Sequence, residues 1–309
     1  MKIGIPKGLL YQYYYPFWRS LFERLGCEVV LSDKSTKSLV GKGIAATVPE
    51  ICLPIKIYMG HVINLKEKGV DYIFCPRFVH IEKGFWFCPK YIGLPELVDK
   101  TLPDTNLLVA EIDCTREDTA DLKSFMPVAH KLGVSRHAMK EALKGAAEDY
   151  AKFREYCHSG LTLDEAADVM FKGVSPDKFK REEYTTTIGL LGYVYNVYDP
   201  FISMEIIDKL RELKVNVVTF DMLDDYDLVK YRDQRTRPIF WTFADKLYEA
   251  ANVMINDMNV QGLIHITAFG CGPDSVVGKE IEHDFADSGV PFMTLRIDEH
   301  TGESHLQTR

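Results

Sequence analysis

The sequence predicts an α/β protein with two lobes, each built on a parallel sheet, joined by a helical segment. Short apolar runs alternate with amphipathic stretches towards both ends of the chain, which is typical of strand–helix–strand units with right-handed crossovers. The middle, from about residue 113 to 183, is charged, poor in Gly and Pro, and rich in helix formers. The length of 309 residues suits two domains. These observations predict an N-terminal α/β lobe (1–115), a helical segment (116–185) and a C-terminal α/β lobe (186–309).

The N-terminal lobe begins with a predicted strand at residues 2–5 and a Pro-Lys-Gly turn at 6–8. A helix is expected over 16–25, because apolar residues recur there at helical spacing, and Gly26 is expected to end it. An apolar loop at 78–87 is expected to cover a site. The other expected elements of this lobe are strands at 28–31, 72–75 and 106–112 and helices at about 36–41 and over 55–68.

The helical segment carries a clear start signal. Thr162 and Glu165 have the spacing of a capping box, which predicts a helix that begins at Thr162. In the C-terminal lobe the α/β pattern returns, and its layout resembles that of the first lobe. The expected elements are strands at 187–194, 216–221, 261–269 and 291–297 and helices over 200–214, 241–258 and 273–288.

Composition excludes several classes of protein. A net charge of −8 argues against a general nucleic-acid binder, which needs a basic surface. No apolar run approaches the ~20 residues that span a bilayer, and the N-terminus lacks the features of a signal peptide. Seven cysteines without a CxxC pair suit a reducing compartment better than a disulfide scaffold. We therefore expect a cytoplasmic protein with neither a membrane nor a nucleic-acid partner.

Four of the seven cysteines stand in turns with Pro or Gly nearby, where strands are expected to meet loops. They are Cys52, Cys75, Cys88 and Cys271. A cysteine is more often a small buried hydrophobe, but proline fixes the backbone and presents a nearby sulfur with little entropy left to lose. Such thiolates suit a metal or an iron–sulfur cluster. The alternative is four separate buried thiols, since the spacing matches neither a ferredoxin run nor a zinc ribbon.

Position within the predicted elements adds to the case for these residues. Cys75 and Cys271 lie at or just beyond strand ends, where open α/β sheets bind ligands. Cys52 and Cys271 each precede a predicted helix, whose N-terminal dipole favours a thiolate. The other three cysteines, Cys27, Cys114 and Cys157, are expected in the core.

Five segments together resemble one protein family. They are 3–10 (IGIPKGLL), 50–56 (EICLPIK), 88–90 (CPK), 269–275 (FGCGPDS) and 298–303 (DEHTGE). They resemble the activase-related relatives of 2-hydroxyacyl-CoA dehydratases, an acyl-CoA dehydratase activase-associated group of unknown function. Residues 193–200 (YVYNVYDP) are similar to the start of the second α/β domain in dehydratase subunits, so the resemblance covers nearly the whole chain.

The resemblance implies two Rossmann-like, flavodoxin-like lobes with a [4Fe–4S] cluster between them, bound by Cys52, Cys88 and Cys271. Cys75 is then either a fourth ligand or a neighbour of the site. In the dehydratases, an ATP-hydrolysing activase passes one low-potential electron to such a cluster. This chain has no P-loop and no acidic, Gly-rich phosphate motif, so it is not expected to be the ATPase itself.

We therefore expect an oxygen-sensitive, anaerobic iron–sulfur protein that accepts electrons from an ATP-dependent activase. It would be a component of the reductase or dehydratase type, with an acyl-CoA or another small molecule as substrate, and a homodimer. One rival is a structural zinc protein, which would need four closed ligands and hence Cys75. Others are a small-molecule-binding α/β module without redox activity and a double-cubane protein, which would need about six thiolates.

Other polar residues are weaker candidates. Lys7, Lys56 and Lys90 would face an anionic cluster or a CoA phosphate, or simply be solvated. Glu299 and His300 suggest metal ligation, but a turn stabilised by side-chain hydrogen bonds is the more economical interpretation. Two histidines in predicted elements, His61 and His265, are expected in the core.

Overall fold

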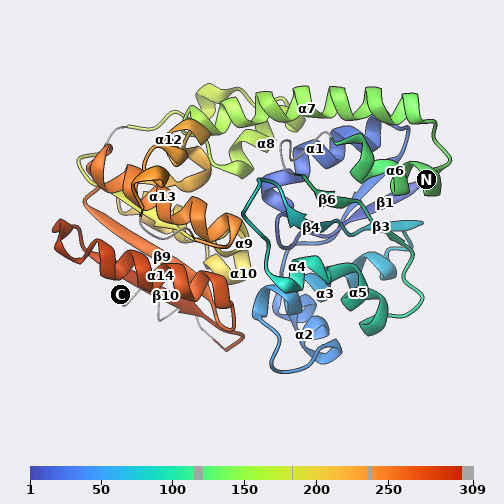
Figure 1. The fold of residues 1–309 in the computed structure, drawn as a ribbon, viewed down its shortest axis with the longest axis horizontal. Coiled ribbons are helices and arrows are strands. Elements are labelled where there is room, and N and C mark those ends of the chain that lie inside the picture. Colours follow the sequence, from blue (N-terminus) through green and yellow to red (C-terminus); the bar gives the residue numbers. More distant parts are fainter. Residues whose placement is uncertain (115–120, 183, 236–238, 301–309) are drawn as a thin grey trace. The chain divides into compact units, whose positions relative to one another are not determined.

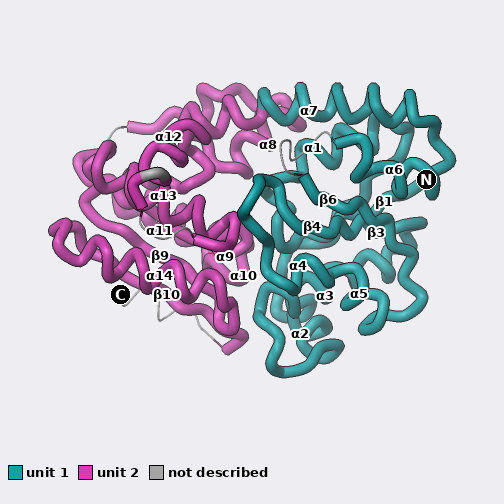
Figure 2. Tube along the Cα trace, in the orientation of Figure 1, with its two compact units in different colours: residues 1–152 teal, residues 153–309 magenta. Residues whose placement is uncertain are grey.

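The computed structural model describes residues 1–114, 121–182, 184–235 and 239–300. It confirms the α/β class, and every ladder between named strands is parallel. The chain divides into two compact units, residues 1–152 and residues 153–309 (Figure 2). The division falls within one long helix, α7 (Arg136–His158), so the segment predicted over 116–185 contributes to both units. Among the described residues, no helix is long and apolar enough to cross a membrane.

Unit 1 contains a four-stranded sheet with the order β2-β1-β3-β5 and a smaller sheet of β4 and β6. Figure 1 labels β1 and β3 of the larger sheet and both strands of the smaller one. Its strands are β1 (Lys2–Ile5), β2 (Glu28–Leu31), β3 (Tyr72–Phe74), β4 (Arg77–His80), β5 (Leu107–Leu108) and β6 (Glu111–Asp113). Its helices are α1 (Tyr11–Arg24), α2 (Lys37–Ala46), α3 (Leu53–Glu67), α4 (Pro89–Ile92), α5 (Leu94–Thr101), α6 (Leu122–Leu132) and α7 up to residue 152.

Helix α1 begins five residues earlier than expected, at Tyr11 instead of Pro16. Proline favours the first turn of a helix, which is why the sequence placed the start there. Aromatic packing decides otherwise, because Tyr14 stacks on Trp18, Phe78 and Tyr150 with ring centroids 5.4–5.9 Å apart. The predicted end is confirmed, since Gly26 follows the C-cap with a φ of 75°.

The strand expected over 106–112 is two strands in different sheets. β5 pairs with β3, and β6 pairs with β4. The break comes opposite Pro76, which has no N–H to donate. Backbone N–H groups on both sides of it still donate across, Cys75 to Leu108 O at 2.9 Å and Arg77 to Ala110 O at 2.8 Å. The region predicted as a covering loop, 78–87, therefore begins within strand β4.

Unit 2 contains a four-stranded sheet with the order β10-β9-β7-β8. Figure 1 labels β9 and β10 of this sheet. Its strands are β7 (Thr187–Leu191), β8 (Asn216–Thr219), β9 (Gly262–Ala268) and β10 (Phe292–Ile297). Its α-helices after α7 are α8 (Leu163–Lys172), α9 (Val194–Tyr198), α10 (Pro200–Ser203), α11 (Ile206–Glu212), α12 (Asp225–Val229), α13 (Thr242–Asn256) and α14 (Gly272–Asp284). The described residues of this unit also form the 3₁₀ turns η1 (Pro176–Phe179), η2 (Phe220–Met222), η3 (Arg232–Gln234) and η4 (Ala286–Ser288).

Two predicted elements of unit 2 are shorter than expected. The strand expected over 187–194 ends at Leu191, and the following residues form the buried helix α9. The helix expected over 200–214 is broken, because Met204 and Glu205 both take left-handed backbone conformations, with φ of 50° and 57°. The capping box predicted at Thr162 and Glu165 is confirmed at the start of α8.

The two units share one strand order. In each, the first strand lies between the second and the third, as β2-β1-β3 and as β8-β7-β9. The first strand of each sheet is therefore flanked on both sides, and ligands of open α/β folds bind at the carboxyl ends beside such a reversal. In unit 1 this position is at the carboxyl ends of β1 and β3, and in unit 2 it is at the carboxyl ends of β7 and β9.

Candidate functional site

Three of the four candidate cysteines occupy the same local position, the N-cap of a helix. Cys52 precedes α3, Cys88 precedes α4 and Cys271 precedes α14, and each helix has proline at its first or second position. An N-cap sulfur faces the free N–H groups of the first turn, which favour a negative charge. Cys75 has no such position, so the structure separates it from the other three.

Cys52 and Cys88 come from separate helices of unit 1 and influence one another. Burial is the main factor that raises the pKa of Cys88, and the neighbouring Cys52 thiol adds to the rise. The backbone N–H groups of Tyr91 and Lys90 oppose it by hydrogen bonding to the sulfur. Cys88 therefore combines a largely buried sulfur with backbone N–H donors and has the Cys52 thiol as a neighbour.

Cys271 belongs to unit 2. In the part of the chain that the structure describes, no three His, Cys, Asp or Glu side chains form a group that could hold a metal ion. The meeting of Cys271 with Cys52 and Cys88 stays a prediction.

The expectation that these cysteines stand where strands meet loops is wrong for Cys52 and Cys88. Cys88 lies in the segment between β4, which ends at His80, and α4. Cys52 lies between two helices, α2 and α3, and not at the end of a strand. Cys271 does follow a strand, β9, and Cys75 directly follows β3. Proline after the cysteine and a helix start are the features that Cys52, Cys88 and Cys271 share.

Cys75 is enclosed in unit 1. Its side chain has 0% exposure, and burial raises its pKa to about 12, while an interaction with the hydroxyl of Tyr58 lowers it. Tyr58 is itself buried, and burial together with Cys75 raises its pKa well above the ordinary value. A thiolate is disfavoured at such a position.

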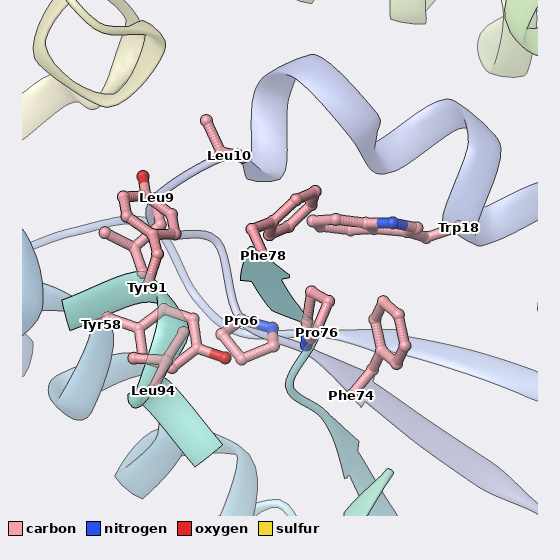
Figure 3. A pocket seen from close by; sticks show the side chains of 11 residues that line it. Pro6, Leu9, Leu10, Trp18, Tyr58, Phe74, Pro76, Phe78, Tyr91 and Leu94 are labelled. Carbon is pink, nitrogen blue, oxygen red and sulfur yellow. The ribbon is translucent and has the colours of Figure 1, made fainter. Parts of the chain in front are cut away.

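The carboxyl end of the β1–β3 pair in unit 1 is filled by side chains. A cavity of about 10 Å³ remains there, lined by Pro6, Gly8, Leu9, Leu10, Trp18, Tyr58, Phe74, Pro76, Phe78, Tyr91 and Leu94. Figure 3 shows Trp18, Phe74 and Phe78 along one side of it and Tyr58, Tyr91 and Leu94 along the other. This volume suits roughly one water molecule. The side chains that line this cavity thus leave room for little more than water.

The segment before Cys88 only partly covers it. Phe87 is buried, with ring centroids 5.1 Å from Phe78 and 5.4 Å from Tyr91. Trp86 is 38% exposed and packs on His80 at 4.6 Å. Phe87 is therefore the aromatic residue of this segment that packs into the interior of unit 1.

The surroundings of Cys271 are polar and buried. The hydroxyl of Tyr195, on α9, lies 3.7 Å from its sulfur. Three residues after Cys271, Asp274 is fully buried and contacts His265 at 2.8 Å and Asn196 at 2.9 Å. Sequence reasoning missed the role of Asp274 and Asn196, because nothing in their spacing shows that two helices and a strand meet there.

A second buried charge cluster of unit 2 was also missed. Asp245 and Glu249 lie one turn apart on α13 and are almost fully buried. Arg232 Nη2 lies 2.7 Å from Asp245, Arg235 Nε lies 2.9 Å from Glu249, and Arg235 also pairs with Asp245. Burial raises the pKa of Glu249 to about 7. The i,i+4 spacing of two acids on an apolar helix was the only available signal.

The weaker candidates from the sequence are three lysines and the Glu299–His300 pair. Lys56 is almost fully buried, contrary to the expectation of a solvated side chain, whereas Lys7 and Lys90 are half-buried. The turn interpretation is confirmed for the Glu299–His300 pair, because the His300 N–H donates to Asp298 Oδ1 at 2.8 Å. The last three residues of the 298–303 segment lie outside the described residues.

The remaining expectations about the core are confirmed. Cys27, Cys114 and Cys157 are all buried. His61 and His265 are buried as well, with 0% and 1% exposure. His61 Nε2 lies 3.0 Å from the Ser35 hydroxyl, and burial lowers its pKa to about 3.

His61 makes the stability of the protein depend on pH. The folded protein keeps His61 neutral, whereas the unfolded chain takes up a proton below its ordinary pKa of about 6.5. The contribution of neutral His61 to the free energy of unfolding is therefore fully present above pH 6.5. It is lost as pH falls towards 3, by up to about 1.4 kcal/mol per pH unit. Urea unfolding at pH 7 and pH 5 should show this loss in the wild type and a smaller one in His61→Gln. His137→Gln, at an exposed position, is the control, and equal pH dependence in all three proteins would contradict the assignment.

Comparison with known proteins gives one family. Residues 2–223 match the CoA enzyme activase uncharacterised domain (DUF2229). No curated protein matches the sequence significantly. Among solved structures, the apo-structure of D-lactate dehydrogenase from Escherichia coli is 13% identical, over 95% of this chain and 89% of that chain. Its TM-score of 0.21 is too low to carry an argument.

Proposed function

Because the chain belongs to the CoA enzyme activase uncharacterised domain family, we propose that it is an iron–sulfur protein related to 2-hydroxyacyl-CoA dehydratase subunits. In this proposal it accepts low-potential electrons from an ATP-dependent activase at a [4Fe–4S] cluster. The protein ligands of that cluster are Cys52, Cys88 and Cys271. The family supports the activase relationship, and the cysteines support the cluster.

One observation carries the proposal. Cys52, Cys88 and Cys271 alone among the seven cysteines of the chain are N-cap residues with a proline in the next two positions. Proline restricts the backbone beside the sulfur, and the helix start favours the anionic form of the ligand and of the cluster. Three unrelated thiols would have no reason to share this position.

The surroundings of the proposed cysteine ligands fit an iron–sulfur cluster. Iron–sulfur clusters take thiolate ligands, and their potentials depend on burial and on hydrogen bonds to sulfur. Cys88 has N–H groups of Lys90 and Tyr91 directed at its sulfur, and Cys271 has the hydroxyl of Tyr195 at 3.7 Å. When bound by three thiolates, a cluster supplies one-electron chemistry and one iron open to a further ligand.

The side chains of this protein have definite tasks in that proposal. Three thiolates bind the cluster, the backbone donors of Lys90 and Tyr91 orient Cys88, and Phe87 excludes water beside it. In this proposal Cys75 is a neighbour and not a ligand, because its side chain is fully enclosed beside Tyr58 and does not stand at the start of a helix. A closed four-ligand site, as in structural zinc, would require Cys75 as a thiolate.

Partners and setting follow from the same relationship. We propose an ATP-hydrolysing activase as the electron donor, an acyl-CoA or another small molecule as substrate, and a reaction of the reductase or dehydratase type. We also propose a homodimer that works in an anaerobic cytoplasm, because an exposed iron is sensitive to oxygen.

The test compares Cys75→Ser with Cys52→Ser, prepared anaerobically. The proposal expects a brown wild-type protein with roughly four irons and matching sulfide per chain. Cys75→Ser should keep iron and sulfide near the wild-type level, while Cys52→Ser should lose most of both. Equal loss in the two variants would indicate a closed site that includes Cys75. Zinc without sulfide in the wild type would reject the cluster altogether.

A further inference from the structure

A buried polar network anchors the start of helix α14, directly after Cys271. His265 Nε2, from the middle of β9, lies 2.8 Å from Asp274 Oδ1. Asn196 Nδ2, from α9, donates to Asp274 Oδ2 at 2.9 Å and to Ile266 O at 3.2 Å. The three side chains have 0–1% exposure. One oxygen of Asp274 is thus held by His265 of β9 and the other by Asn196 of α9.

The network lies at the β7–β9 reversal of the sheet. Helix α9 follows β7, and α14 follows β9, so Asn196 and Asp274 join the two connections that meet there. Asp274 is the third residue of α14, where an acidic side chain commonly folds back on its own N-cap. Here it reaches His265 and Asn196 instead. The first turn of α14, and with it Cys271, is therefore tied to the sheet.

Close packing against Gly278 of α14 fixes the position of the His265 ring. A Cβ atom on Gly278 would lie 2.4 Å from both Nδ1 and Cε1 of His265, far closer than any real contact. The ring therefore packs on the bare backbone of α14, one turn after Asp274. Among the described residues, His265 Nδ1 has no hydrogen-bond partner, so the polar contact of this ring is with Asp274.

A buried carboxylate is costly unless its oxygens are paired, and apolar residues of the same shape often give equal or higher stability. A network of this kind is better suited to fixing a geometry than to raising stability. The geometry that it fixes is close to Cys271, because Tyr195, next to Asn196 on α9, has its hydroxyl 3.7 Å from the Cys271 sulfur.

We infer that Asp274, His265 and Asn196 are positioning residues that hold the Cys271 thiol in place, an inference that rests on the proposed role of Cys271 as a ligand. Asp274 fixes the first turn of α14 from within, and His265 and Asn196 hold Asp274 from the strand and from α9. They act through the cysteine.

The test measures Cys271 directly in the metal-free protein. Each cysteine is followed by alkylation with iodoacetamide and peptide mass spectrometry, so that Cys52 and Cys88 serve as internal references. Asp274→Ala and His265→Leu should raise the alkylation rate of Cys271 about tenfold, as local opening becomes easier, and leave Cys52 and Cys88 unchanged. Asp274→Asn, which keeps the shape and can still hydrogen-bond, should restore most of the protection.

Two further variants keep the test decisive if a network variant unfolds. Gly278→Ala displaces His265 without removing any polar group, and it should expose Cys271 in the same way. Thr267→Val, two residues from His265 on β9 and equally buried, is the matched control and should leave Cys271 protected. Cys271 reactivity that stays at the wild-type level in Asp274→Ala and Gly278→Ala, despite a lower melting temperature, would overturn the inference.

Iron binding separates this inference from the proposed function. If the wild type binds iron, the network variants should bind it with weaker retention by Cys271, seen as faster loss to a chelator. If the wild type binds no iron while the variants still expose Cys271, the cluster proposal fails and the positioning role stands.

Discussion

Serine in place of Cys52, Cys88 or Cys271 is expected to remove most of the iron and sulfide from the anaerobically prepared protein. A serine hydroxyl is far less acidic than a thiol and is a harder ligand, so it does not replace a thiolate on an iron–sulfur cluster. Loss of one of three ligands also leaves too few bonds to retain the cluster. Iron and sulfide per chain, with the visible spectrum, are the measurements.

Two buried cysteines outside the proposed site provide the control. Cys27→Ser and Cys157→Ser should keep their iron, with a packing penalty of about 1 kcal/mol. Cys157 is fully buried in α7, so it reports what loss of a core thiol does to the fold. Equal iron loss in the two sets would mean general instability and not ligation.

The second large effect is expected at the contact between helices α2 and α3, which sets the start of α3 and hence the position of Cys52. A Cβ atom on Gly43 would lie 1.8 Å from the carbonyl oxygen of Lys56. The same holds in the other direction, because a Cβ atom on Gly60 of α3 would lie 2.4 Å from the carbonyl oxygen of Leu39 in α2. The two backbones thus touch through glycine. Gly43→Ala should push the helices apart and lower the free energy of unfolding by about 2 kcal/mol, beyond what alanine gains in helix propensity.

Gly41→Ala, in the same helix, is expected to act in the opposite direction. A Cβ on Gly41 meets no atom within 4 Å, so alanine should stabilise the protein by about 0.5–1 kcal/mol through helix propensity alone. Denaturant unfolding of the two variants measures the difference. A similar stability change in both would show that α2 and α3 are not in close contact.

The sequence by itself determined the features that depend on neighbouring residues. Alternation of apolar and amphipathic stretches predicted an α/β protein with parallel sheets. Thr162 with Glu165 marked the start of α8, and Gly26 marked the end of α1, because caps and left-handed turns depend on a few adjacent residues. The family resemblance likewise came from short segments, and it agrees with the match over residues 2–223.

Only the tertiary structure decided the features that depend on residues far apart in the chain. Helix α1 starts before Pro16 because Tyr14 packs on Phe78 and Tyr150. No residue near Met204 and Glu205 predicted the break between α10 and α11.

The candidate site shows the same division. Four cysteines stand near Pro or Gly in the sequence, and the family resemblance set Cys75 apart from the other three without deciding its role. The fold encloses Cys75 against Tyr58 and places the other three at helix starts. The Asp274 network joins residues 9 and 78 positions apart. Caps and periodicity follow from local backbone geometry, whereas burial and buried hydrogen bonds exist only after distant segments have packed together.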